Sequence, residues 1–323
     1  MSAIAHTQRR AGAFLKLLQT NPTLGVYAVL IIMLVVCAIF VTGFASSENL
    51  INILQRSVAL SLVSFGQTFA IVGGSLDLSV GNAISAMAVL TSLVMAGRVE
   101  MMIPVVALVI VVGMFIGLLN GLIVTRLRVN PFIATLGMSL FIQGVLFSGF
   151  DNFAGSVPRD FEFLGYSTVG PIPVGVIFML LVALAAHFLL RHTRFGYHLY
   201  GMGGSAEVAR LSGVRTGRVM IIAHVLTGLG AALTAIFIAS RLRAGAPWVG
   251  QGMELESISA VVVGGAPLSG GRGGIWGTLA GVLILSILSN IFNILNVGAF
   301  AQDVLRGAIL IAVVAFYTAR MRR

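Results

Sequence analysis

Apolar residues recur along this chain in long runs that are nearly free of charged side chains and are separated by short polar breaks. Each run is long enough, or nearly long enough, to cross about 30 Å of hydrocarbon as a helix that rises about 1.5 Å per residue. Ten spans are predicted: 24–43, 57–74, 78–97, 102–124, 131–150, 172–190, 219–239, 254–271, 275–295 and 301–319. The pattern therefore predicts an all-α polytopic membrane protein, with residues 1–323 forming a single transmembrane domain.

The eighth span, 254–271, is the weakest of the ten, because Gly264, Gly265 and Pro267 interrupt it. Irregular backbone at membrane depth is tolerated only where protein or a water-filled cavity satisfies its N–H and C=O groups. We therefore expect a short or re-entrant segment here. Glycines also repeat at four-residue spacing in two other spans, at Gly113, Gly117 and Gly121 and at Gly277 and Gly281, and these stripes predict close helix packing.

The composition changes the picture by excluding a water-soluble protein. Of the 323 residues, 58% are apolar and 9% are charged, whereas soluble domains average roughly 45–50% and about 25%. A net charge of +10 suggests a nucleic-acid partner in a soluble chain, but so few charges cannot build a solvated basic groove. We therefore expect the chain to be surrounded by membrane lipid and not to bind nucleic acid. The single cysteine, Cys37, excludes an intrachain disulfide and a thiolate metal cluster.

The basic residues predict how the chain is oriented in the membrane. Lys and Arg are in excess in cytoplasmic loops, and an even number of crossings from a cytoplasmic N-terminus places fourteen of them inside and five outside. Both termini are therefore predicted to be cytoplasmic. A cleaved signal peptide at Gly43-Phe44-Ala45 is the competing interpretation, but the preceding polar segment and apolar run are too long for one.

Residues for catalysis or metal binding are missing from the sequence. It contains no His-Glu-x-x-His pair, no Gly-x-Ser-x-Gly elbow and no phosphate-binding loop, and Lys16 is its only lysine. We therefore expect no catalytic residue, no metal site and no ATPase site. Ionisable residues that could carry a coupling ion are few, and Asp303 and Arg306 stand three apart on one helical face, where they are expected to neutralise each other.

Three segments differ from the rest of the chain. The first, 73–81, places Asp77 at the start of a helix, where it either caps free backbone N–H groups or lines a polar path. The second, 191–218, contains a short helix that Ser205 caps and Gly213 stops, which is either a docking element or a basic loop that only enforces topology. The third, 254–274, carries a glycine-rich turn, for which helix packing is favoured over a phosphate nest.

Together these segments resemble the membrane permease family of bacterial ATP-binding-cassette importers for ribose, xylose, arabinose, galactose and related solutes. The resemblance covers about residues 49–310. Its most specific pieces are Leu76-Asp77-Leu78-Ser79-Val80-Gly81, Arg194-Phe195-Gly196, Gly203-Gly204, Ala209-Arg210-Leu211-Ser212-Gly213, Glu254-Leu255, Gly264-Gly265 and Leu268-Ser269-Gly270-Gly271-Arg272-Gly273. Ser75, Ser205, Val208 and Ala266-Pro267 depart from the usual pattern, which leaves the transporter subgroup and the solute open.

The resemblance implies a multi-pass permease of the bacterial inner membrane, in a core with a second permease copy or homologue. It also implies two cytoplasmic ATPase subunits, which bind ATP and Mg²⁺, and a periplasmic solute-binding protein, so this chain itself needs no cofactor. By position, residues 191–218 form a cytoplasmic coupling loop that meets the ATPase. The residues expected to act in this loop are Gly203, Gly204, Glu207, Arg210 and Gly213.

Polar side chains within the spans are candidates for the translocation path of a sugar. Uncharged groups that exchange hydrogen bonds with hydroxyls suit such a solute, although they also serve as interhelical hydrogen bonds. The candidates are Gln67, Asp77, Asn130, Gln143, Asn290 and Asn293. Two other functions remain open at this stage, namely an ion-coupled sugar transporter that works alone and a passive channel.

Overall fold

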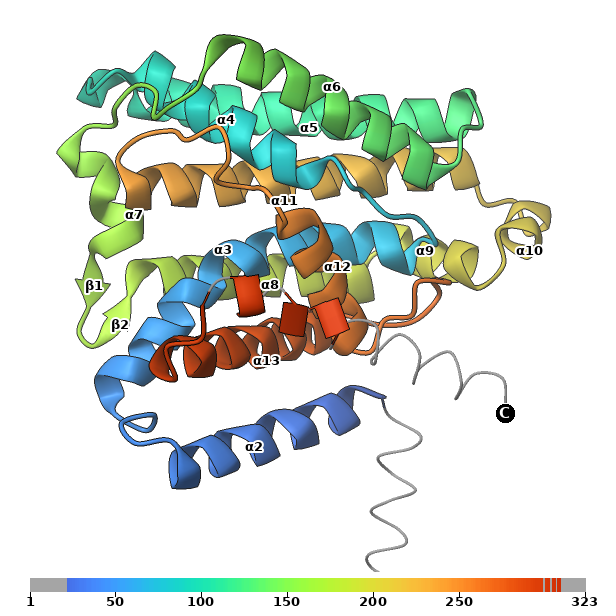
Figure 1. The fold of residues 1–323 in the computed structure, drawn as a ribbon. Helices are drawn as coiled ribbons and strands as arrows, with labels where there is room; N and C mark the ends of the chain where they lie inside the picture. The colour runs from blue at the N-terminus through green and yellow to red at the C-terminus, as the bar shows by residue number, and fades with distance from the viewer. Residues whose placement is uncertain (1–21, 299, 303, 306, 309–323) are drawn as a thin grey trace, which may run out of the picture.

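The computed structural model describes residues 22–298, 300–302, 304–305 and 307–308, and almost all of its regular structure is helical (Figure 1). The helices are α2 (Pro22–Phe40), α3 (Ser47–Val72), α4 (Val80–Met95), α5 (Met102–Arg126), α6 (Pro131–Gly149), α7 (Phe163–Tyr166), α8 (Val174–His192), α9 (Arg194–Gly204), α10 (Ala206–Leu211), α11 (Thr216–Leu242), α12 (Met253–Val263) and α13 (Ile275–Ile294). Two 3-10 turns, η1 (Val99–Met101) and η2 (Arg159–Glu162), and an antiparallel hairpin of β1 (Thr168–Val169) and β2 (Ile172–Pro173) complete the described elements.

Each of the first nine predicted spans contains a helix, whereas most of the tenth, together with Asp303 and Arg306, lies outside the described residues. Within the part of the chain that the structure describes, five helical segments are long and apolar enough to cross a membrane: Val99–Arg126, Pro131–Gly149, Val174–His192, Thr216–Leu242 and Ile275–Ile294. The predicted start of the second span is wrong by ten residues, because α3 begins at Ser47. The Ser46 side chain accepts a hydrogen bond from the Asn49 N–H, so a polar cap sets this helix start and not the beginning of the apolar run.

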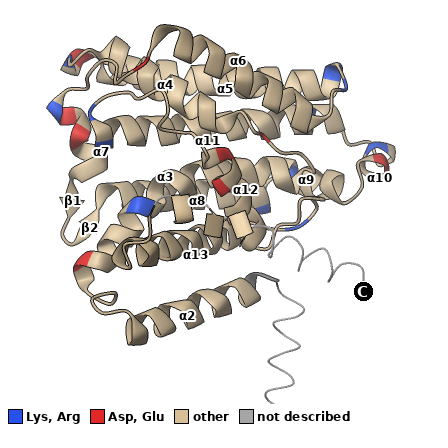
Figure 2. Cartoon of the chain, in the orientation of Figure 1, with Lys and Arg blue, Asp and Glu red and all other residues tan. Residues whose placement is uncertain are grey.

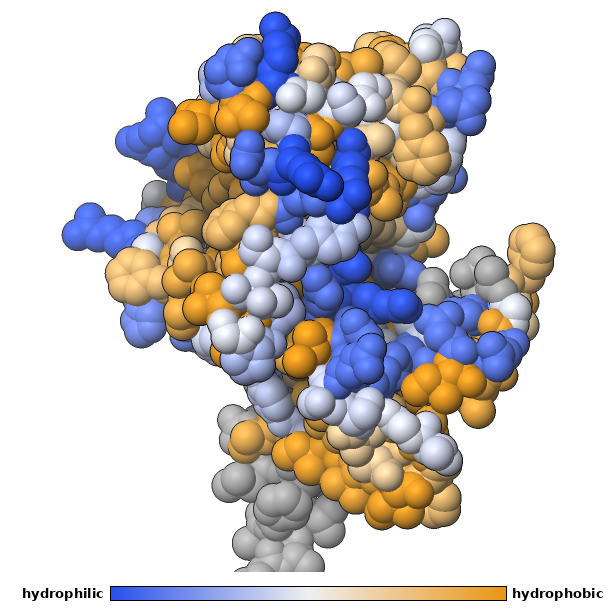
Figure 3. Space-filling view, turned by 90° about the vertical axis from the view of Figure 1, so that its left-hand side faces the viewer, coloured by the Kyte–Doolittle hydropathy of each residue, from blue (hydrophilic) through white to orange (hydrophobic). Residues whose placement is uncertain are grey.

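The outer surfaces of the bundle are apolar in the way that a lipid-facing surface requires. Large side chains such as Ile103 (83% exposed) and Phe141 (68% exposed) point away from the core on α5 and α6. Most charged residues lie toward the two ends of the bundle (Figure 2), and Figure 3 shows hydrophilic residues gathered over the end that carries α7 and the β hairpin. These features confirm an all-α polytopic membrane protein.

Helices α3 and α11 lie at the centre of the bundle, and the predicted glycine stripe brings α5 against α11 (Figure 1). A Cβ atom added to Gly117 would overlap the His224 carbonyl group, and one added to Gly228 would overlap the Gly113 carbonyl group. Gly277 and Gly281 approach α12 with the same closeness, at Gly264 and Ala260. The stripes therefore allow the helix backbones themselves to touch.

We expect Gly117→Val to destabilise the protein by about 3 kcal/mol, because the new side chain has no space between α5 and α11. The measurement is thermal unfolding of the purified chain in detergent. Gly144→Val is the matched control, since a Cβ atom at this exposed position of α6 would meet nothing within 4 Å. Equal melting temperatures for the two variants would contradict the packing argument.

Two helices, α4 and α12, begin inside the bundle after non-helical segments, 73–79 and 243–252 (Figure 1). Helix α12 has only 11 residues, which confirms the short segment expected near 254–271. The two helix starts lie side by side, because the Gly250 N–H donates to Ser85 Oγ (2.9 Å) and a Cβ atom on Gly81 would lie 2.7 Å from the Gly250 carbonyl oxygen. The Glu254 carboxylate also packs on Gly81, where it adds negative charge next to the two positive helix ends.

Candidate functional site

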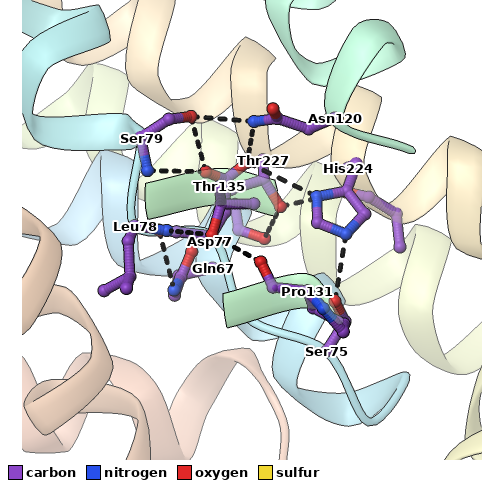
Figure 4. A network of polar contacts seen from close by, with 12 residues as sticks. Gln67, Ser75, Asp77, Leu78, Ser79, Asn120, Pro131, Thr135, His224 and Thr227 are labelled. Carbon is purple, nitrogen blue, oxygen red and sulfur yellow. Dashed lines mark hydrogen bonds and ion pairs between the residues drawn. The ribbon is translucent and has the colours of Figure 1, made fainter. Parts of the chain in front are cut away.

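The break between α3 and α4 places Asp77 in a network of buried polar side chains (Figure 4). The residue is 1% exposed. Its Oδ1 accepts hydrogen bonds from the Ser79 N–H (2.8 Å) and from the Ser79 hydroxyl (2.6 Å). These bonds hold the chain in a tight turn just before α4. The N-cap residue of α4 is Ser79, and no side chain caps the helix. Asp77 therefore stabilises the turn before α4, and the prediction that it caps the helix itself is wrong.

The second carboxylate oxygen of Asp77 faces two helices that are distant in sequence (Figure 4). Asn120 of α5 donates from Nδ2 to Oδ2 (3.0 Å), and His224 of α11 places Nδ1 3.4 Å from the same atom. The other ring nitrogen of His224 lies 3.0 Å from the Ser75 hydroxyl. A carboxylate is costly at membrane depth unless it has partners, and this one accepts hydrogen bonds from Ser79 and Asn120 and lies beside the His224 ring.

Two more helices are tied to the same segment through its backbone. Gln67 of α3 donates to the Asp77 carbonyl oxygen (3.3 Å), and the Leu78 N–H donates to the Thr135 hydroxyl of α6 (3.0 Å). The break at 73–79 is thus bound to α3, α5, α6 and α11. Movement of this segment therefore changes contacts with four helices at once. Among the described residues, no group of three or more His, Cys, Asp or Glu side chains could hold a metal ion.

The six predicted path residues do not gather in one place. Gln67 and Asp77 share the network, whereas Asn130 caps α6 by accepting from the Phe132 N–H (2.9 Å) and is exposed. Asn290 exchanges two hydrogen bonds with Asn49 (2.8 and 3.2 Å). Asn293 is exposed and accepts a hydrogen bond from Gln302. Gln143 is a half-buried residue of α6. Asn290 therefore forms the interhelical hydrogen bonds of the alternative interpretation, whereas Asn130 caps its own helix.

Sequence reasoning did not assign Asn120 and His224 to the site, although both are fully buried. A signal was present for Asn120, which is the one amide in the run 102–124 and stands between Gly117 and Gly121 on the face that packs closely. His224 lies on the opposing helix at the same contact. An amide within a close-packing stripe therefore indicates a polar partner on the neighbouring helix.

The cytoplasmic loop predicted at 191–218 is largely helical, because α9 and α10 occupy most of it. Ser205 caps α10 by accepting from the Val208 N–H (3.3 Å), as predicted. Gly213 follows the helix with φ +84°, and the Val214 N–H reaches back to the Ala209 carbonyl oxygen (3.0 Å). This is the backward bonding of a glycine-terminated helix end, so both ends of the short helix agree with the sequence.

Helix α10 projects from one end of the bundle (Figure 1). It exposes both charged and apolar side chains. Arg210 donates to both carboxylate oxygens of Glu207 (2.7 and 3.1 Å), and these bonds hold the pKa of Glu207 below its ordinary value. Val208 is 62% and Leu211 72% exposed beside this pair. An exposed apolar and charged surface on an ordered helix has the features of a protein-binding surface.

Gly203, in contrast, is not a surface group like Glu207. It lies at the end of α9, where an added Cβ atom would overlap the Val72 carbonyl group. Gly204 is exposed, and a Cβ atom there would meet nothing within 4 Å. The five coupling-loop residues therefore divide into an exposed group on and around α10 and one glycine that faces the bundle.

The structure is an apolar helical bundle that contains a broken helix, held by a buried ionisable pair, and a projecting helix. Together these features define a membrane transport subunit. Residues 49–314 match the family model of the branched-chain amino acid transport system / permease component. The ribose import permease protein RbsC of Escherichia coli is 35% identical over 293 residues, which are 88% of this chain and 91% of that protein. RbsC of Bacillus subtilis is 36% identical over 297 residues (90% and 91%). The L-arabinose transport system permease protein AraH of E. coli is 36% identical over 294 residues (90% and 89%).

The chain therefore belongs to the permease family of bacterial ABC importers, and the resemblance found in its sequence is confirmed. It is a multi-pass inner-membrane protein and the transport subunit of an importer. Membership in this family implies an ATPase and a periplasmic binding protein as partners. No solved structure matches the chain.

Proposed function

We propose that this permease translocates a monosaccharide or a similar small hydroxylated solute, which a periplasmic binding protein delivers and ATP hydrolysis on partner subunits drives. The observation that carries the proposal is that relatives named for ribose and arabinose match about nine-tenths of the chain. The family description names branched-chain amino acids, so these solutes are the competing substrate class. The buried hydroxyl and amide groups around Asp77 suit a hydroxylated solute better than an aliphatic one.

In this proposal the ATP chemistry belongs to the partner subunits, which bind ATP and Mg²⁺. The sequence offers no phosphate-binding loop. Helix α10, with Glu207 and Arg210 exposed on it, docks on the ATPase, and a second permease copy or homologue completes the core. Ten crossings with both termini in the cytoplasm complete the topology, and α2 begins on the side of the bundle that carries α9 and α10 (Figure 1).

The solute path in this proposal passes the broken segments, where α4 and α12 begin. Gln67 and Asp77 remain its candidate residues, because they lie at the first of these breaks. A helix that starts at membrane depth presents unpaired N–H groups to a polar solute. Alternating access then requires that the breaks change position relative to α3 and α11.

The test is uptake into proteoliposomes that contain the chain alone or together with its ATPase and binding protein. Labelled ribose, arabinose and leucine are offered in separate assays. We expect accumulation of a sugar about tenfold above background only with both partners and internal ATP. Uptake of leucine but not of sugars would change the substrate class. Two results with the chain alone would contradict the proposal: accumulation of solute driven by a proton or sodium gradient, or passive equilibration of solute across the membrane.

A further inference from the structure

Two segments that are distant in sequence meet the end of α9: the end of α3 with the break that follows it at 73–79, and the glycine-rich loop 264–274. The Gly271 N–H donates to the Val72 carbonyl oxygen (2.9 Å). A Cβ atom added to Gly203 would overlap both of these backbone groups. At Gly203 the end of α9 therefore packs directly on backbone, whereas the Leu199 and Met202 side chains of the same helix lie against Gly73.

The contact depends on glycine at several positions. Gly270 and Gly271 have φ values of +83° and +75°, which L side chains rarely adopt. A Cβ atom added to Gly270 would lie 2.7 Å from the Gly74 nitrogen and 3.1 Å from the Gly203 Cα. We define Gly74, Gly203, Gly270 and Gly271 as the glycine junction, in which three backbones touch directly.

Side chains from α8 and α9 hold the loop against this junction. The Tyr200 hydroxyl donates to the Gly273 carbonyl oxygen (2.7 Å), and Arg191 donates to the same oxygen (3.3 Å). The Arg191 guanidinium also lies over the Tyr200 ring, 4.9 Å from its centre. When α9 moves, the loop that leads into α13 is therefore held to it by hydrogen bonds as well as by packing.

On its other side the glycine junction leads directly into the Asp77 network. Gly74 is followed by Ser75, whose hydroxyl lies 3.0 Å from His224 Nε2. At the same end of α9, two residues after Gly203, Ser205 both ends this helix and caps α10. One continuous series of contacts thus runs from exposed α10 through α9 and the glycine junction to the break before α4.

Backbone contacts of this kind transmit displacement, because at Gly203 no side chain lies between the two surfaces to absorb it. Packed interiors are dense and have low compressibility. A shift of α9 by a fraction of an ångström must therefore displace Val72 and Gly271 or break the contact. The same shift reaches both irregular segments, because Gly271 belongs to 264–274, while 73–79 directly follows Val72 and packs through Gly74 on Gly270.

We infer that Gly203 is a positioning residue for transport, and that the glycine junction passes movement of α9 and α10 to both irregular segments together. This inference rests on the proposed docking of α10 on the ATPase. It adds the route by which ATP binding reaches the breaks, and it explains why a residue without a side chain is needed at position 203. The expected consequence of filling the junction is ATP hydrolysis that no longer drives import.

The experiment compares Gly203→Ala with Gly201→Ala in the assembled complex of permease, ATPase and binding protein. Both changes replace glycine by alanine in α9 and give the same gain in helix propensity. Position 201 is exposed, and a Cβ atom there would meet nothing within 4 Å. Three quantities are measured, namely co-purification of the subunits, ATP hydrolysis, and solute imported per ATP hydrolysed.

We expect the solute imported per ATP to fall about tenfold in Gly203→Ala and to stay unchanged in Gly201→Ala. If Gly203→Ala does not assemble, Tyr200→Phe decides, because it removes one hydrogen bond without adding volume and should lower the same ratio about threefold. Any of three results would overturn the inference. The solute imported per ATP could be unchanged in Gly203→Ala, or it could fall equally in Gly201→Ala. If Gly203→Ala fails to assemble, an unchanged ratio in Tyr200→Phe is the third. Failure of the wild-type complex to import any solute would instead count against the proposed function.

Discussion

Replacing Asp77 by Leu should destabilise the folded protein by about 3 kcal/mol, because it leaves several buried hydrogen-bond partners unsatisfied. The substitution leaves the Ser79 N–H, the Asn120 amide and His224 without their acceptor in a site closed to water. The measurement is thermal unfolding in detergent, together with the amount of protein in the membrane fraction. Asp151→Leu, in an exposed position, is the control and should be close to wild type.

The same position distinguishes a simple turn from a network. The turn needs only Oδ1, so Asn should replace Asp77 with little loss if holding the turn is the whole role. In the structure, however, Oδ2 accepts from Asn120 Nδ2, and an Asn side chain cannot accept at both positions. We therefore expect Asp77→Asn to be intermediate between wild type and Leu. Equal stability of the Asn variant and the wild type would reduce Asp77 to a residue that only stabilises the turn.

Glu207→Lys should abolish ATP-driven uptake, with a fall of about tenfold or more, and leave membrane insertion and stability unchanged. Glu207 is paired only with Arg210 on exposed α10, and exposed pairs contribute little to stability. Reversing its charge places two cations together on the proposed docking surface, which disfavours the wild-type partner. The assay is uptake by the assembled complex, with co-purification of the ATPase as the direct measure of docking.

A charge reversal at the other end of the bundle, Glu100→Lys, is the matched control, because Glu100 is also exposed. Gly213→Asp tests the same surface by another route. It places a side chain at φ +84° and weakens the end of α10 without changing Glu207. Normal uptake in both Glu207→Lys and Gly213→Asp would remove α10 from the docking surface.

Much of the fold follows from local pattern. Nine helical spans, the short segment near 254–271 and the capped helix from Ser205 to Gly213 were predicted, because apolar run length, caps and glycines act within a few residues. The start of α3 was predicted ten residues too late, because the prediction followed only the local apolar run. The first turns of this helix carry polar residues, which a hydropathy pattern assigns to a loop.

The candidate site was predicted only in part. Asp77 was identified because it stands in a visible break, and Gln67 because an amide is unusual in an apolar run. Asn130 and Asn290 gave the same signal, yet one caps a helix and the other pairs with Asn49. A polar residue in a membrane span has several uses, and the sequence does not tell which partner lies opposite.

The sequence by itself determined that this chain is a helical membrane protein, where its helices break, and to which transporter family it belongs, since these depend on transfer to lipid and on local backbone chemistry. Only the tertiary structure decided that Asn120 and His224 meet Asp77, and that Gly203 touches Val72 and Gly271. Such contacts join residues between 43 and 147 positions apart, and they arise from helix packing, whose register no local pattern specifies.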